Sequence, residues 1–427
     1  MFFTKPINFI FKILILFLRI VAFLISKIII FKFVLRQTSR IGGLVREIDT
    51  FTFNQFDTTN MNKTIFILVR EHPICNLFLN EVVEKKIKKL IKHCYFFDRN
   101  KFIDYWLSSE ARFPLGRPKD KNKHMSPHDN EGNVAPRFHN EYSYNYDYIK
   151  YPFLNFNHKE ISKENNFLNN LNLEKKNWIC THNRDSNYLD NLKNHDHFKN
   201  MDFKYHNYRD SDVNNLIKST KLLLENNFYV FRMGRIQSSK MDFKHPNFID
   251  YAFEKDRSDF NDIYLLSNCA AYLGSDSGPG DIPFLSGKPR FLMNYSLTML
   301  GIFHLGGNEM SRRNHYPFIF KHLYDEKTQK KLTLKQVINK RLLGQGNGEE
   351  LRREGVLPIE NSDEEIFDLT LEMVNYLETK KINSQDDYEI QKKFWDIYYE
   401  NTTYKRFEDI PARICSKFLS KNMYILE

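Results

Sequence analysis

The chain has 427 residues, 41% of them apolar and 15% aromatic, a composition that allows two or three domains with packed cores and excludes wholesale disorder. Its net charge of +10 comes mostly from the first 40 residues, which carry seven basic side chains and no acidic one. The rest holds 56 basic and 53 acidic side chains, so it lacks the basic excess of a nucleic-acid-binding domain, and we expect no nucleic-acid partner. Five cysteines without metal-type spacing predict a reducing compartment and no metal site.

Residues 1–40 predict a membrane-associated helix. The stretch 7–35 is strongly apolar, and its cations Lys12, Arg19 and Lys27 fall within an arc of roughly 80° on a helical wheel. A basic stripe on an apolar helix fits an anionic membrane surface, and a single-pass anchor with snorkelling cations fits nearly as well. If the segment spans the membrane, the cations Lys27, Lys32, Arg36 and Arg40 at its C-terminal end favour placing the rest of the chain in the cytoplasm. Both alternatives predict a protein at the cytoplasmic face of the cell membrane.

Residues 55–174 predict a first Rossmann-like domain. Within it, 63–69 is typical of a buried strand, 75–92 of a helix with a lysine-rich face, and 95–97 of a second strand. Residues 114–150 are rich in Pro, Gly, Asn, His and Tyr and have no periodicity. A lid, a substrate-binding loop and a disordered segment all fit that stretch, which is long for a passive connection.

Strands and helices alternate in the second half, which predicts a parallel, Rossmann-like sheet over residues 175–355. The expected strands are 178–180, 228–231, 248–251, 270–273 and 290–293, and the expected helices are 211–226, 259–267 and 278–286. Residues 356–427 are expected to form C-terminal helices that pack back on the core, the first with a capping box at Ser362 and Glu365. The predicted fold class is therefore α/β, with two Rossmann-like domains and the N-terminal membrane-associated helix.

The segment YLGSDSGPGDIP, residues 272–283, joins a buried strand to a helix through a turn rich in glycine and serine. Gly278 lets the backbone approach a ligand closely, and Pro279 suits the first turn of a helix. A helix N-terminus presents free N–H groups and the positive end of the helix dipole, which suit a phosphate. An ordinary strand–helix turn is the alternative interpretation.

Polar clusters follow four expected strands, at the edge where open α/β sheets bind ligands. They occupy residues 181–185, 232–235, 258–262 and 274–280. Arg184 suits a diphosphate, because its guanidinium forms paired hydrogen bonds and neutralises a leaving group. His182 lies on the same side of an extended segment, where it binds phosphate or ribose or is a structural histidine. The run 208–210 caps the next helix or adds a cation.

Two further pairs carry open alternatives. Arg232 and Arg235 are second anion contacts or plain surface charges. Asp259 and Asp262 cap the short helix or accept hydrogen bonds from a nucleobase or ribose.

His182-x-Arg184, the Asp259 region and the turn 274–278 before a helix together resemble the donor-binding half of GT-B glycosyltransferases. The His-x-Arg element is similar to that of the α1,6- and protein O-fucosyltransferases, and the Asp-Ser-Gly turn resembles that of the heptosyltransferases. The run from Trp178 to about Asn294 most resembles an uncharacterised bacterial family of predicted glycosyltransferases.

This resemblance implies metal-independent transfer of a sugar from a nucleotide-sugar, as substrate and without a cofactor, to a cell-surface glycan or lipid-linked acceptor. It implies catalytic roles for Arg184 and His182. The donor would be held by Ser275, Asp276, Ser277, Gly278, Arg232, Gly234 and Asp259. The first domain would bind the acceptor and supply any base, for which Glu71, His72, His128, Asp129 and His139 are unranked candidates.

The chain departs from these families at two positions. Pro279 follows the Asp-Ser-Gly turn where heptosyltransferases have a histidine, and Asp185 stands where fucosyltransferases often have a second arginine. The donor therefore stays open, and a nucleotide-sugar epimerase of the same fold or a non-catalytic membrane-bound scaffold are the alternative functions.

Overall fold

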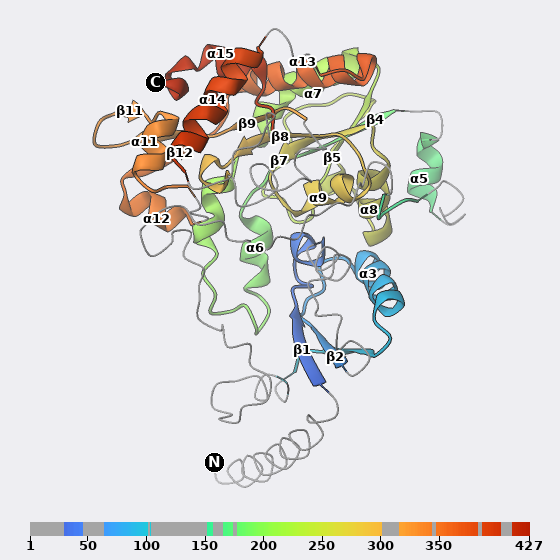
Figure 1. The fold of residues 1–427 in the computed structure, drawn as a ribbon. Coiled ribbons are helices and arrows are strands. Elements are labelled where there is room, and N and C mark those ends of the chain that lie inside the picture. The colour runs from blue at the N-terminus through green and yellow to red at the C-terminus, as the bar shows by residue number, and fades with distance from the viewer. Residues whose placement is uncertain are drawn as a thin grey trace. The chain divides into compact units, whose positions relative to one another are not determined.

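The computed structural model describes residues 30–45, 64–100, 103, 152–156, 165–173, 177–300, 316–343, 347–382, 387–402 and 412–427. The chain divides into two compact units, Met1–His124 (unit 1) and Met125–Glu427 (unit 2). Each unit is built on a parallel sheet with helices, so the predicted α/β class is confirmed (Figure 1).

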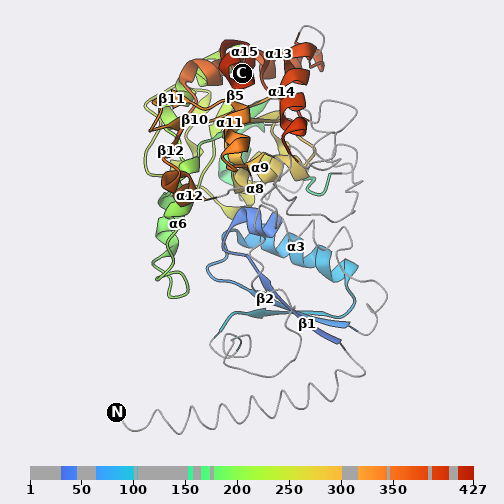
Figure 2. The ribbon, with the colours of Figure 1, turned by 60° about the vertical axis from the view of Figure 1, so that its left-hand side comes forward.

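Unit 1 contains a three-stranded parallel sheet in the order β1-β2-β3. Its elements are β1 (Ile30–Arg36), β2 (Thr64–Arg70), α3 (Leu77–Leu90) and β3 (Cys94–Asp98). The helix begins where the Asn76 side chain accepts a hydrogen bond from the Leu79 N–H at 2.8 Å. Apolar residues recur along α3 at helical spacing, and Leu79, Val83 and Ile87 are buried. Figure 2 shows the helix beside the strands.

Strand β1 corrects the prediction of a helix over residues 1–40. Its seven residues pair in parallel with β2, from Ile30 opposite Thr64 to Arg36 opposite Arg70. The run IFKFVLR is rich in β-branched and aromatic residues, which suit a strand as well as an apolar helix, and its pairing with β2 decides between them. Residues 1–29, the rest of the predicted segment, lie outside the described residues. Among the described helices, none combines the length and apolarity needed to cross a membrane.

Unit 2 is organised around a six-stranded sheet whose strands are all parallel. The strands are β4 (Trp178–His182), β5 (Tyr229–Arg232), β6 (Phe248–Ile249), β7 (Ala271–Ser275), β8 (Arg290–Tyr295) and β9 (Phe318–Phe320). Their order in space is β6-β5-β4-β7-β8-β9. Numbered along the chain this is 3-2-1-4-5-6, the order of a doubly wound sheet, and it reverses between β4 and β7.

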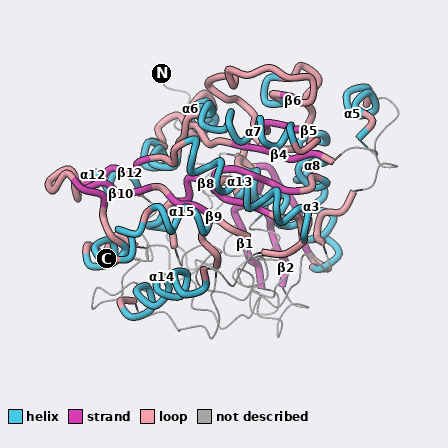
Figure 3. Tube along the Cα trace, turned by 90° about the horizontal axis from the view of Figure 1, so that it is seen from above, coloured by secondary structure: helices cyan, strands magenta, loops and turns pink. Residues whose placement is uncertain are grey.

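Two pairs of helices cover this sheet. Helices α7 (Ile217–Glu225) and α13 (Asp363–Thr379) contact each other, and α13 also contacts β7, β8 and β9. Helices α8 (Asp259–Asn268) and α9 (Gly278–Leu285) form the other pair, and α9 contacts β7 and β8. The strands lie between the two pairs in Figure 1, and Figure 3 shows α7 and α13 over the sheet.

The helix ends test three predictions about capping. The capping box of α13 at Ser362 and Glu365 is confirmed. The helix predicted over 211–226 begins as a 3₁₀ turn capped by Asp212, not by Asp210 or Ser211. Helix α8 is capped by Ser258, whose side chain accepts from Asn261 N, and not by Asp259 or Asp262. Each observed cap lies directly before the first helical turn, where its side chain reaches an otherwise unpaired N–H group.

The expected boundary at residue 174 differs from the division between the units. Residues 152–156 already belong to unit 2, where the N–H groups of Phe153 and Leu154 donate to the Leu285 carbonyl at the end of α9 at 2.8 and 3.3 Å. The C-terminal residues also complete unit 2, since Ile414 bridges to Phe318 at the edge of the sheet.

Short elements fill the rest of unit 2. They are α5 (Asn166–Leu171), α6 (Asn187–Leu192), β10 (His322–Asp325), β11 (Lys330–Lys331), α11 (Leu334–Asn339), α12 (Gly348–Arg353), β12 (Val356–Ile359), α14 (Tyr388–Glu400) and α15 (Ser416–Lys421). Strands β11, β10 and β12 form a small antiparallel sheet.

A buried carboxylate anchors α3 to the sheet of unit 1. Glu84 accepts hydrogen bonds from Arg36 Nη1 at 2.5 Å, Arg70 Nε at 2.6 Å and Asn80 Nδ2 at 3.0 Å. Arg36 has no exposed surface, so its charge depends on this partner. Removing one member of a buried ion pair leaves the other uncompensated.

We therefore predict that Glu84→Ala lowers the stability of unit 1 by about 3–5 kcal/mol. Hydrogen exchange of β1 and β2 amides in the full chain, followed by mass spectrometry, measures this change. Glu81→Ala, on an exposed position of the same helix, is the matched control and should change stability by less than about 0.5 kcal/mol. Equal protection in the two variants would contradict the anchoring role.

Candidate functional site

The candidate site lies where the strand order of unit 2 reverses, between β4 and β7. His182 at the end of β4 is paired with Gly274 of β7. A Cβ atom on residue 274 would come within 2.6 Å of both the His182 carbonyl oxygen and the Tyr272 hydroxyl, so only glycine allows this close approach. In doubly wound sheets, ligands bind outside the carboxyl ends of the strands at such a reversal.

Arg184 is buried at this point with unused hydrogen-bond donors. Its side chain is 8% exposed, and its backbone N–H donates to Ser275 Oγ at 3.2 Å. Nη1 of the guanidinium forms an ion pair with Asp210, whereas the N–H groups of Nη2 have no hydrogen-bond partner among the described residues. Burial and, secondly, the charge of Arg209 lower the pKa of Arg184. A buried guanidinium with unused donors is unfavourable by itself and would be completed by a bound anion.

Two more cations lie beside Arg184. Arg209 donates from Nη2 to the Asp276 carbonyl at 2.8 Å, while its buried Nε has no hydrogen-bond partner among the described residues. Lys321, the residue after β9, is 4% exposed and donates from Nζ to the Asp210 carbonyl. We call Arg184, Arg209 and Lys321 the cation cluster.

The titration of Lys321 is shifted by its surroundings. Its pKa is lowered to about 8, mainly by burial and also by the positive charge of Arg184, while the negative charge of Glu360 opposes the shift. The amine thus changes charge close to physiological pH, which links the strength of the cation cluster to pH.

The glycine-rich turn, residues 274–280, contacts the cation cluster. Ser275 is 1% exposed, and its Oγ accepts from the Arg184 N–H and lies 3.5 Å from Ser211 Oγ. Asp276 contributes its backbone carbonyl to Arg209. Ser277 precedes α9 without capping it, because its hydroxyl donates to the Ser275 carbonyl at 3.3 Å. The first N–H groups of α9, from Gly278 on, are therefore not capped by that side chain.

His182 is a neutral group in this structure. It is 5% exposed, its Nδ1–H donates to the Met233 carbonyl at 2.9 Å, and burial lowers its pKa to about 4. With Nδ1 protonated, Nε2 carries a lone pair and accepts hydrogen bonds. This state suits a sugar or ribose hydroxyl better than a phosphate.

Arg232 is neither an anion contact nor a surface charge, which corrects both predicted alternatives. Its side chain has no exposed surface. The guanidinium donates to Asn183 Oδ1 at 3.1 Å, Gln237 Oε1 at 3.0 Å, the Ser239 carbonyl at 3.0 Å and Asp250 Oδ1 at 2.9 Å. All of its nitrogen atoms are thus bonded within the protein, and its role is to hold the loop after β5.

Gly234 supports the same loop. A Cβ atom there would lie 2.7 Å from Gln237 Cγ, so the glycine makes room for the side chain that binds Arg232. Asp259 begins α8 and pairs with Arg235 at 3.3 Å. The structure therefore brings Arg184, His182 and Ser275 together at the reversal point, and it places Arg232 and Gly234 in the supporting loop.

Two of the candidate bases, Glu71 and His72, lie among the described residues. In unit 1, Glu71 accepts from Ser39 Oγ at 2.5 Å, and His72 Nε2 lies 3.0 Å from an Asp98 carboxylate oxygen. His128, Asp129 and His139 lie outside the described residues.

Lys321 is the site residue that sequence reasoning missed. The predicted strands ended at residue 293, so the short run Phe318–Phe320 and the lysine after it were not assigned to the sheet. A lysine directly after an aromatic run was the available signal. Arg232, at the end of the aromatic run in β5, gives the same signal, however, and that arginine is structural.

No protein-family model matches the chain, and neither a curated protein nor a solved structure is significantly similar to it.

The two buried arginines should contribute unequally to stability. Arg232→Met removes the guanidinium that donates hydrogen bonds to four groups of the protein. It should lower the free energy of unfolding by about 3–5 kcal/mol. Arg184→Met should cost less than Arg232→Met, because the one ion-pair partner that it leaves behind, Asp210, is partly exposed. Urea denaturation of the full chain measures both, and an equal loss in the two variants would contradict the contrast.

Proposed function

We propose that this protein is a GT-B glycosyltransferase with two Rossmann-like domains that uses a nucleotide-sugar donor. The observation that carries the proposal is the buried Arg184 with unused donors at the reversal point of a doubly wound sheet. Arg209, Lys321 and the start of α9 add positive charge and N–H groups to the same place. A nucleoside diphosphate has the negative charge and the oxygen acceptors that such a place lacks.

The proposed reaction follows from this charge. Transfer breaks the bond between the sugar's anomeric carbon and the diphosphate oxygen, so negative charge develops on the leaving diphosphate. Arg184, Arg209 and Lys321 would stabilise that charge, with no metal ion required for it. His182 would accept a hydrogen bond from a donor hydroxyl through Nε2. A general base would take the proton from the acceptor hydroxyl as the new glycosidic bond forms.

The acceptor proposed is a cell-surface glycan or a lipid-linked sugar at the cytoplasmic face of the membrane. This part of the proposal rests on the apolar, basic sequence of residues 7–29. Sedimentation of the full chain with anionic lipid vesicles tests it, and recovery in the supernatant at low salt would contradict it.

A thermal-shift screen of nucleoside diphosphates and their sugars identifies the donor. We predict that Arg184→Gln weakens binding of the diphosphate found by this screen by about 10²–10³-fold in isothermal calorimetry, because the lost guanidinium faces the phosphates. Arg353→Gln, at an exposed position of α12 in unit 2, is the control and should bind as the wild type does. A screen without any shift would favour a non-catalytic scaffold.

Incubation with the identified nucleotide-sugar, without an acceptor, separates transferase from epimerase. A transferase leaves the sugar unchanged or hydrolyses it slowly, whereas an epimerase inverts one of its carbons. Epimer formation would overturn the proposed function.

The pKa of Lys321 predicts a pH dependence of diphosphate binding. Below about pH 8 the amine is charged and attracts the diphosphate, and above that pH the charge is lost in the free protein. Affinity should therefore fall as pH rises above about 8, by at most about tenfold per pH unit. Lys321→Met should bind more weakly at neutral pH and show a flat profile over the same range. An unchanged slope in that variant would remove Lys321 from the site.

A further inference from the structure

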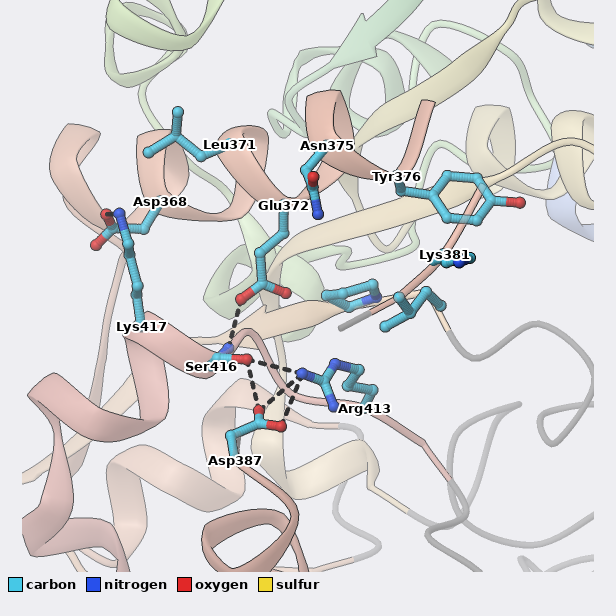
Figure 4. Close-up of a pocket in the computed structure, with 12 residues that line it drawn as sticks. Asp368, Leu371, Glu372, Asn375, Tyr376, Lys381, Asp387, Arg413, Ser416 and Lys417 are labelled. Atoms are coloured by element: carbon cyan, nitrogen blue, oxygen red, sulfur yellow. Dashed lines mark hydrogen bonds and ion pairs between the residues drawn. The ribbon is translucent and has the colours of Figure 1, made fainter. Parts of the chain in front are cut away.

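A cavity of about 270 Å³ lies in unit 2 away from the cation cluster. Residues of α13, the start of α15 and the segments beside them line it (Figure 4). One wall is Pro317, which precedes β9, whereas Lys321 follows β9. The cavity and the cation cluster therefore lie at opposite ends of the same strand, and the cavity is at the amino edge of the sheet.

The charges of this cavity cancel one another. Three acidic residues, Asp368, Glu372 and Asp387, and three basic residues, Lys381, Arg413 and Lys417, contribute to its lining. Such a lining has no excess charge with which to attract an ionic ligand.

Oppositely charged side chains of the cavity lining form direct ion pairs. Arg413 Nη2 contacts both Asp387 carboxylate oxygens at 2.8 Å, and Ser416 Oγ donates to Asp387 at 2.5 Å (Figure 4). Asp368 contacts Lys421 at 2.5 Å and Lys417 at 3.8 Å. These carboxylates are engaged with the protein and are poor partners for a cationic ligand.

Polar groups nevertheless remain unused in the cavity. Arg413 is 7% exposed, and its buried Nε–H has no acceptor among the described residues. Glu372 accepts the Ser416 N–H through Oε1 at 2.6 Å, and burial raises the pKa of its carboxyl group above the usual range. The side-chain amide of Asn375 lies beside Glu372 (Figure 4). The carboxyl group of Glu372 and the amide of Asn375, beside a space large enough for a ligand, favour a polar occupant.

The remaining lining is apolar. Leu371, Ile382, Pro317 and the ring of Tyr376 contribute carbon surface to the same space. The required ligand is thus uncharged, carries several hydroxyl or amide groups and presents C–H surface as well. Its volume must be small, because small-molecule pockets are commonly about 300–1,000 Å³ and this cavity of about 270 Å³ is slightly smaller. A single pyranose ring meets all of these requirements.

We propose that this cavity binds one neutral sugar residue, as a glycan-binding site separate from the nucleotide-sugar site. Glu372 and Asn375 bond its hydroxyl groups, and the apolar wall contacts its C–H groups. The site does not depend on the proposed transferase reaction, because its residues and those of the cation cluster are different.

Saturation-transfer NMR on the full chain tests this site with glucose and N-acetylglucosamine as neutral probes. Glucosamine and glucuronate, of similar size but opposite charge, are the matched comparisons. We expect the neutral sugars to bind and the charged ones to bind more weakly. A stronger signal from either charged sugar, or none from both neutral ones, would overturn the proposal.

Two variants locate the binding. Asn375→Ala removes a polar contact, and Leu371→Trp fills the space without removing a polar group. Each should weaken sugar binding at least about fivefold, the effect of one lost hydrogen bond or more. Unchanged melting temperatures show that both variants fold. Sugar binding that neither variant weakens would overturn the proposal.

The same measurement separates this site from the proposed function. Arg184→Gln, which weakens diphosphate binding, should leave the sugar signals in the cavity unchanged. Sugar binding that is lost in Arg184→Gln and retained in Asn375→Ala and Leu371→Trp would assign it to the nucleotide-sugar site instead.

Discussion

The close approach of β4 and β7 at Gly274 is the constraint on which unit 2 depends. Any side chain at this position would clash with the His182 carbonyl, so the two strands pair here only because residue 274 is glycine. Their pairing is also the point where the strand order reverses and the connections on either side diverge. Ser275, at the end of β7, consequently accepts a hydrogen bond from the Arg184 N–H. The glycine-rich turn that follows contacts the cation cluster through the Asp276 carbonyl, which accepts from Arg209.

Two buried arginines show how stability and function separate in this site. Arg232 donates to four groups of the protein and holds the loop after β5. Arg184 is almost as buried, but its guanidinium has one ion-pair partner and unused donors. Burying a charge without full compensation opposes folding. Arg184 therefore contributes less to stability than Arg232, although it is almost as buried. An anion that uses those donors would gain interactions that no described part of the protein supplies.

Most elements of unit 2 could be predicted because their signals are local. The apolar runs at 178–180, 228–231, 270–273 and 290–293 are bounded by turn residues and form strands, and the capping box at Ser362 and Glu365 begins α13. The run 30–36 could not be assigned in this way. Its apolar residues suit a membrane helix and a parallel strand equally well, and only pairing with β2, far along the chain, makes it a strand.

The sequence by itself determined the α/β class, the alternation of strands and helices in unit 2 and the set of polar residues that follow its strands. These features depend on periodicity and on strand ends, which are set by residues close together in the chain. It did not determine which of those polar residues has unused donors. Arg184 and Arg232 both lie in polar clusters that follow expected strands, and the sequence gives no reason to separate them. Only the tertiary structure decided this, since the partners of a buried side chain, such as Asp250 for Arg232 and Asp210 for Lys321, come from other segments of the chain.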